Sequence, residues 1–341
     1  MRGGRYRLSP ARTVGRKHMR KLAAALVIVA SVLLTPAPAA ATGNGEWAVT
    51  PTPAGNPGPT PRLYFFLDAH AGETVKESVR VTNLTAKPRS FVIYGADAYN
   101  TARNGGFAIR TRTDAQKDLG SWVRSQVTAV EVPARTSADI PFTIAVPANA
   151  TPGDHVGGIV AMEASASSTA QADGATVNIQ RAVAARVYLR VAGAVVPGLG
   201  VPELNLDVRA PLLPTITGGD LEYTVANVGN IHLVPAATVT MTGLFGHRIT
   251  VTGATPASDM VPGAQGAFAM RARGIWPLDV VTTAVAVRAE GDVFAQRTER
   301  TVVVSWTALL LLALLITGIV LLIRRRRRAR ELRPRGLVAA R

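Results

Sequence analysis

The chain has 341 residues, of which 38 are Lys or Arg and 22 are Asp or Glu, so its formal net charge is +16. The excess charge lies at the two ends. Residues 1–21 hold eight basic residues and no acidic one, and residues 324–341 hold nine Arg and one Glu. The stretch between them has 21 basic and 21 acidic residues, so the charge does not indicate nucleic-acid binding. The chain has no Cys, which excludes disulfides, thiolate metal sites and Cys nucleophiles.

The N-terminal segment has the pattern of an export signal. Its basic residues precede the 13-residue apolar run Leu22–Leu34, which is short for a bilayer span. The small residues Ala39–Ala41 follow and match an A-x-A-like cleavage site. We therefore expect residues 1–41 to be a signal peptide that is cut after Ala41, with a retained N-terminal membrane anchor as the alternative.

A second apolar run lies near the C-terminus. Residues 302–323 carry no charge, and as a helix they would reach about 33 Å, enough to cross the hydrocarbon core. Trp306 stands near one end as an interfacial aromatic residue, and five consecutive arginines, Arg324–Arg328, follow the other end. The positive-inside rule then predicts a single-pass protein of the cell membrane, with the ectodomain outside and residues 324–341 as a basic cytoplasmic tail.

Between these segments the hydrophobic residues recur with a period of two. Val79 and Val81 alternate with polar residues, and so do Val187 and Leu189. Such alternation, interrupted by Gly, Pro and Asn turn signals, is typical of short strands in a β-sandwich. We predict an all-β ectodomain with two immunoglobulin-like β-sandwich domains, over residues 46–195 and 199–300, and a hinge between them.

Several residues of the first domain are candidates for ligand binding. Tyr94, Asp97 and Tyr99 could form a glycan platform, because aromatic faces stack on sugars and carboxylates bond to hydroxyl groups. Trp122 is a candidate exposed contact, and His155 is a candidate ligand contact beside two glycines. For each residue the alternative is a packing or turn role within the sandwich.

The first domain also resembles a known family. It is similar to the peptidoglycan-binding domain of the WxL-interacting proteins of Gram-positive cell surfaces over roughly residues 46–195. The residues that carry the resemblance are Trp47–Pro51, Ala71–Val75, Val79–Leu84, Tyr94–Asn100, Val146–Ile159 and Arg186–Gly193. The resemblance implies an extracytoplasmic protein that is associated with peptidoglycan and could act as a receptor for other wall proteins.

The sequence predicts a binding protein and not an enzyme, with an enzyme that acts on wall polymers as a further alternative. It contains no G-x-S-x-G, H-E-x-x-H or phosphate-binding glycine motif. We expect no metal site, no cofactor and no small-molecule substrate. The main functional hypothesis is binding of cell-wall peptidoglycan, or of wall-associated proteins, through the first sandwich. The alternative is an assembly protein that binds other surface proteins by β-strand addition, without direct glycan binding.

Overall fold

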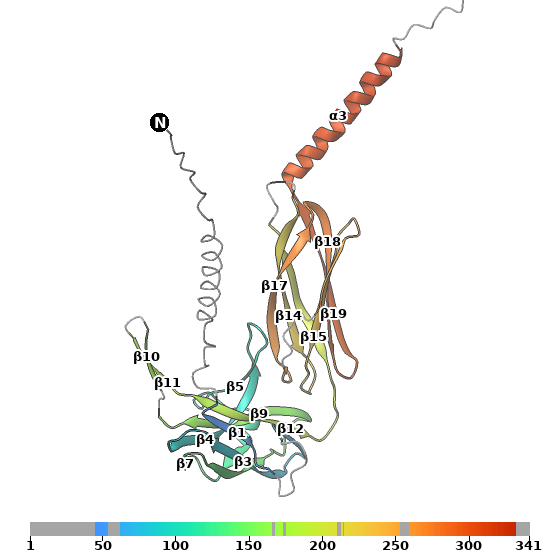
Figure 1. Cartoon of the computed structure of the whole chain (residues 1–341). Coiled ribbons are helices and arrows are strands. Elements are labelled where there is room, and N and C mark those ends of the chain that lie inside the picture. Colours follow the sequence, from blue (N-terminus) through green and yellow to red (C-terminus); the bar gives the residue numbers. More distant parts are fainter. Residues whose placement is uncertain are drawn as a thin grey trace, which may run out of the picture. The chain divides into compact units, whose positions relative to one another are not determined.

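A computed structural model of the chain describes residues 45–53, 62–165, 168–172, 175–209, 213, 215–252 and 259–331. The predicted signal peptide, residues 1–41, and the end of the predicted cytoplasmic tail, from residue 332, lie outside the described residues. The described part consists mainly of β-strands arranged in two sandwiches, followed by one long helix (Figure 1). The predicted all-β, immunoglobulin-like fold class is therefore confirmed.

Two sheets face each other in the first sandwich. One sheet has the order β1 (Trp47–Pro51), β3 (Thr74–Asn83), β8 (Ser137–Ala145), β6 (Val123–Ser125). The other has the order β2 (Phe65–Ala69), β12 (Ala182–Val191), β9 (Gly153–Glu163), β4 (Arg89–Asn100), β5 (Phe107–Ile109), with β7 (Ala129–Val132) also paired to β4. A short helix, α2 (Leu119–Trp122), precedes β6, and β10 (Ser168–Ala172) forms a separate hairpin with β11 (Ala175–Ile179).

The period of two explains how this sandwich forms. In β3, Val79 and Val81 are fully buried, whereas Arg80 between them is not. Phe65 of β2 meets Phe142 of β8 edge-on, with ring centroids 5.4 Å apart, and both rings are buried. The two sheets are thus held together by the inward-facing residues of alternating strands.

The second sandwich has a hydrophobic core of its own. One of its sheets has the order β13 (Leu199–Asp207), β14 (Thr217–Asn227), β17 (Gln265–Ile275). The other has the order β16 (Arg248–Thr252), β15 (Ala236–Thr242), β18 (Leu278–Ala289), β19 (Val293–Val304). Tyr223 stacks on Phe268 inside this core, with ring centroids 5.6 Å apart. The two cores share no member residue, as expected for two separately packed domains.

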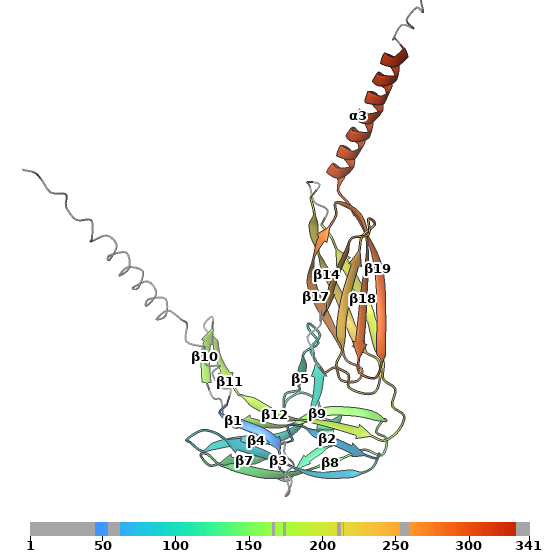
Figure 2. The same ribbon diagram turned by 45° about the vertical axis from the view of Figure 1, so that its right-hand side comes forward.

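The long helix α3 (Trp306–Glu331) follows β19 directly (Figure 2). The apolar run starts earlier than the helix does, because residues 302–304 belong to β19 and pair with residues 278–280 of β18. Val303 is buried in the second core, so the first residues of the apolar run pack in the sandwich and are not part of the helix. Residues 306–328 form the one helix, within the described part of the chain, that is long and apolar enough to cross a membrane.

Candidate functional site

The structure places Asp97 inside the first sandwich. Its side chain accepts hydrogen bonds from three backbone amides, those of Lys117 (2.6 Å), Asp118 (3.1 Å) and Gly120 (2.7 Å). The residue is 4% exposed. Asp97 thus fixes the loop that leads into α2, and its carboxylate oxygens are already engaged by backbone donors.

Trp122 and His155 lie together. Their ring centroids are 4.5 Å apart, and both residues are buried. The imidazole is further held by Asp118, with 2.5 Å between Nδ1 and Oδ1, and by the carbonyl of Thr151, 2.9 Å from Nε2. Burial opposes the charged imidazole, but these bonds outweigh it and raise the pKa of His155.

The two predicted tyrosines do not join this cluster. Tyr94 is partly buried on β4, and burial raises the pKa of its hydroxyl. Tyr99 is more exposed, and the guanidinium of Arg110 lies over its ring at 5.4 Å. The roles of these five residues in ligand binding stay predictions, and the structure brings only Trp122 and His155 into contact among them.

A different group of aromatic residues lies at the border of β2 and β12. The rings of Phe66 and Tyr188 are stacked at 5.1 Å with an interplanar angle of 11°, and Tyr64 meets Tyr188 edge-on at 6.1 Å. Phe66 is 66% exposed and Tyr64 is 39% exposed. We call these three residues the aromatic strip. Two features of the sequence could have indicated the aromatic strip. Tyr188 alternates with Val187 and Leu189, which places it on the opposite face of the strand, and the run Leu63-Tyr64-Phe65-Phe66 is rich in aromatic residues.

The aromatic strip borders an unpaired stretch of strand. β12 pairs with β9 over all of Ala182–Val191, but β2 covers only Val187–Val191 on the other side. Along residues 182–186, therefore, no strand among the described residues occupies the second side. We call this stretch the open edge. Val183 is 36% exposed although it points to the same face as the buried Ala185 and Val187.

The backbone of the open edge is directed outward at alternate residues. Glu163 of β9 donates its N–H to the carbonyl of Arg181 at 3.0 Å, so the peptide groups of residue 181 face β9. Because these directions alternate along an antiparallel strand, Ala182 and Ala184 direct their N–H and C=O groups away from β9. Both side chains are small, which leaves the backbone sterically accessible.

Hydrogen bonds to Asp259 hold two side chains of β12 in place. Arg186 donates to Asp259 at 2.9 Å, and the hydroxyl of Tyr188 donates to the same carboxylate oxygen at 2.5 Å. Burial and the Asp259 bond raise the pKa of Tyr188 to about 12, so this hydroxyl stays protonated and donating at neutral pH. The aromatic strip is thereby anchored at its Tyr188 end.

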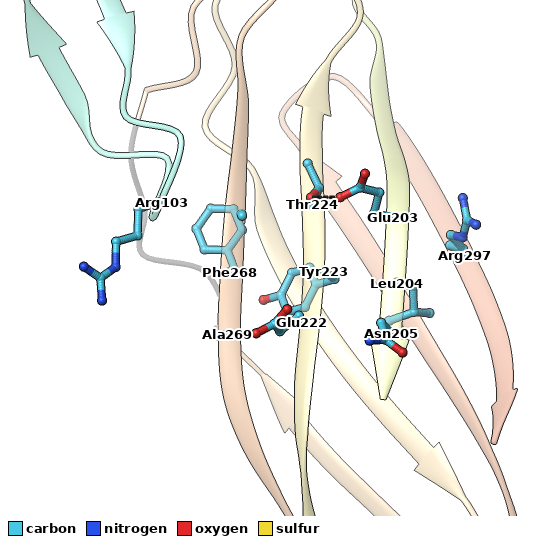
Figure 3. A pocket seen from close by; sticks show the side chains of 11 residues that line it. Arg103, Glu203, Leu204, Asn205, Glu222, Tyr223, Thr224, Phe268, Ala269 and Arg297 are labelled. Carbon is cyan, nitrogen blue, oxygen red and sulfur yellow. Dashed lines mark hydrogen bonds between the residues drawn. The ribbon is translucent and has the colours of Figure 1, made fainter. Parts of the chain in front are cut away.

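A separate open groove of about 650 Å³ lies over β13, β14 and β17 (Figure 3). Glu203 accepts a hydrogen bond from Thr224 at 3.1 Å, and Glu222 lines the groove as well. Arg297 donates to the carbonyl of Pro202, and in the close view Arg103 points away from the two carboxylates. The polar groups of this groove therefore do not converge on a common point.

In the described part of the chain, no three His, Asp or Glu residues are grouped so that they could hold a metal ion. The sequence carries no Cys that could add a thiolate ligand.

Comparisons with known proteins give structural similarities only. No family model matches the chain, and no curated protein matches it, so the resemblance to the WxL-interacting proteins stays a prediction. Among solved structures, the chain is similar to the class 5 fimbriae chaperone CfaA, with 12% identity, coverage of 75% of this chain and 99% of that chain, and a TM-score of 0.34.

Two further solved structures show the same level of similarity. The E. coli chaperone DraB is 8% identical, with coverage of 75% of this chain and 96% of that chain and a TM-score of 0.32. The CsuC-CsuE complex of Acinetobacter baumannii, a chaperone with a tip subunit of Csu pili, is 10% identical, with coverage of 66% and 90% and a TM-score of 0.32. Similarity at this level says nothing about what this chain binds.

Proposed function

We propose that this chain is a membrane-anchored surface protein that binds another protein by β-strand addition at the open edge of β12. The single observation that supports this function is the half-paired strand. Ala182–Arg186 is held firmly by β9 on one side, and no described strand occupies the other side. An incoming strand would extend the sheet and pair with the backbone groups that point away from β9.

The surroundings of the open edge favour a partner with apolar side chains at alternate positions. Backbone hydrogen bonds supply affinity in this mode of recognition, whereas pockets for alternate side chains supply specificity. Exposed apolar groups lie on both faces of the sheet here, Val183 on the core face and the aromatic strip on the other. A strand with apolar residues at its centre would cover both.

The anchor in this proposal is α3. Most of its apolar side chains are not covered by any other described part of the protein, as expected for a helix that lipid surrounds. Arg324–Arg328 then mark the cytoplasmic end, and both sandwiches lie on the outer side of the membrane. This orientation presents the open edge to other surface proteins.

Photo-crosslinking in cells tests the proposal directly. A photoreactive amino acid at Ala184 of the full chain should capture a distinct protein, and the Ala182→Pro substitution in the same chain should abolish that capture. Proline removes the outward N–H of residue 182 while leaving the bonds of β12 to β9 intact. Recovery of glycan fragments instead of a protein would favour peptidoglycan binding and overturn strand addition.

A matched control is available on another edge strand. Among the described strands, β16 pairs with β15 alone, and Gly243 donates its N–H to the carbonyl of His247 at 3.0 Å. By the same alternation Thr250 directs its N–H outward. Thr250→Pro should therefore leave capture at Ala184 unchanged. If both proline variants lost capture to the same extent, the loss would come from a disturbed fold and not from the open edge.

A further inference from the structure

The second sandwich is joined to α3 without a linker. β19 ends at Val304 and α3 begins at Trp306, so Ser305 alone separates them. Ser305 is fully buried, and its N–H donates to the carbonyl of Pro277 at 2.8 Å, while Leu309 donates to the carbonyl of Ser305 at 3.0 Å. The first turn of the helix is thus bonded to the sandwich itself.

Three connections between strands lie at this same end of the sandwich. The β15–β16 turn is tied to the start of β18, because Leu244 donates its N–H to Asp279 at 2.8 Å. Leu278 at the start of β18 is paired with Val304, the last residue of β19. The β17–β18 turn contains Pro277, whose carbonyl accepts the hydrogen bond from Ser305. The β13–β14 connection ends at Thr217, which is paired with Ile275 at the end of β17.

These three connections expose large apolar side chains. We call the set the apolar tip: Leu213, Ile216, Leu244, Phe245 and Trp276. The first four are each more than 60% exposed, and Trp276 is 40% exposed. The ring centroids of Phe245 and Trp276 are 5.5 Å apart, and the ring of His247 stacks on Trp276 at 5.1 Å. Trp276 is therefore held in a fixed position at the surface.

We infer that the apolar tip rests in the interfacial region of the lipid bilayer that α3 crosses. The inference rests on the proposed membrane anchor and adds a second contact with the same membrane. A helix that leaves the sandwich after one buried residue brings this end of the sandwich close to the membrane surface. Aromatic and aliphatic side chains at loop tips are stabilised at that depth, whereas in water they would form an exposed apolar patch.

The partner is thus a lipid surface, and the contact has a mechanical consequence. A single spanning helix can tilt in the bilayer and carry the attached domain with it. Additional side chains seated in the interface restrict that tilt, so the second sandwich would stand in a defined orientation on the membrane. The first sandwich and its open edge would then be presented in a preferred direction.

Depth-dependent quenching can test this inference, and the absence of Cys makes labelling specific. The full chain carrying Phe245→Cys with a fluorescent label is reconstituted into vesicles of phosphatidylcholine and phosphatidylglycerol that contain a headgroup-nitroxide lipid. The label should lose roughly half of its emission or more, because the interfacial layer that buries such side chains is about 5–10 Å deep.

Phe294→Cys is the matched control. Phe294 is also an exposed phenylalanine of the second sandwich, but it lies at the start of β19, next to the turn at the opposite end from α3. Its label should keep its emission in the same vesicles. Equal emission from the two labels, with the chain still in the membrane after an alkaline carbonate wash, would overturn the inference and leave the anchor intact. Removal of the chain by that wash would overturn the anchor and the inference together.

Discussion

His155 lies within hydrogen-bonding distance of two acceptors of its own sandwich, with Nδ1 2.5 Å from Oδ1 of Asp118 and Nε2 2.9 Å from the carbonyl oxygen of Thr151. A carbonyl oxygen only accepts, and an ionised carboxylate only accepts. Both bonds are therefore made together by the protonated imidazolium. This explains why the pKa of His155 is raised although burial alone would lower it.

The stability of the first sandwich should accordingly fall as pH rises. A group whose pKa is higher in the folded than in the unfolded state stabilises the fold fully below the unfolded value, which is about 6.5 for His. That contribution is lost as pH rises through the raised pKa of folded His155. Urea unfolding of the ectodomain at several pH values from about 6 upward should show this decline.

His155→Gln supplies the control, because glutamine keeps a polar side chain but does not titrate. The variant should lose the part of the pH dependence that the wild-type chain shows above neutrality. Asp118→Asn should weaken the same dependence, since it removes the charge that stabilises the imidazolium. A decline of unchanged steepness in the His155→Gln chain would assign the effect to another group.

Asp97→Asn should destabilise the first sandwich at neutral pH. The carboxylate accepts three backbone N–H groups, and an amide can offer only one oxygen while it brings two N–H donors of its own into a buried site. We expect a cost of about 1–3 kcal/mol in the free energy of unfolding. Asp220→Asn, at a side chain that is 64% exposed, should change it by less than about 0.5 kcal/mol.

The sequence patterns predicted the fold better than they predicted the site. Alternation along β3 and β12 depends on local spacing, so it could be read directly from neighbouring residues. The environment of Asp97 could not be predicted from the sequence. Its partners are backbone amides some twenty positions away, and a backbone amide leaves no mark in the residue pattern. The open edge was also hidden, since it depends on the parallel register that places Phe65 opposite Val187. The apolar run at 302–323 likewise combines a strand end with a helix, and composition alone does not separate them.

Leu312→Arg should impair membrane retention of the full chain. Leu312 lies inside the apolar part of α3, and a charged residue near the centre of a spanning helix costs about 2.5–3.5 kcal/mol of insertion free energy. The fraction of chain that resists carbonate extraction measures the effect. Leu312→Ala keeps the helix apolar and should be retained. Normal retention of the arginine variant would show that α3 does not cross the membrane.

Asp154→Asn should weaken the junction between the two sandwiches. Asp154 lies on β9, is 2% exposed at its side chain, and bonds Arg190 at 2.6 Å and His232 of the second sandwich at 2.6 Å. Burial raises the pKa of Asp154, but the bonds from His232 and Arg190 outweigh it and hold that pKa well below its usual range. The wild-type chain therefore gains stability from this carboxylate above the unfolded pKa of about 4, and loses it as pH falls below that value.

At neutral pH the asparagine variant should lose about 2–3 kcal/mol of stability, because hydrogen bonds to a buried charge are replaced by bonds to a neutral group. The difference from the wild-type chain should shrink when unfolding is measured at progressively lower pH. Asp68→Asn is the matched control, since Asp68 is exposed beside the same Arg190. If both variants unfold alike, or if the Asp154→Asn deficit stays constant down to strongly acidic pH, the carboxylate does not join the sandwiches in the way that its contacts indicate.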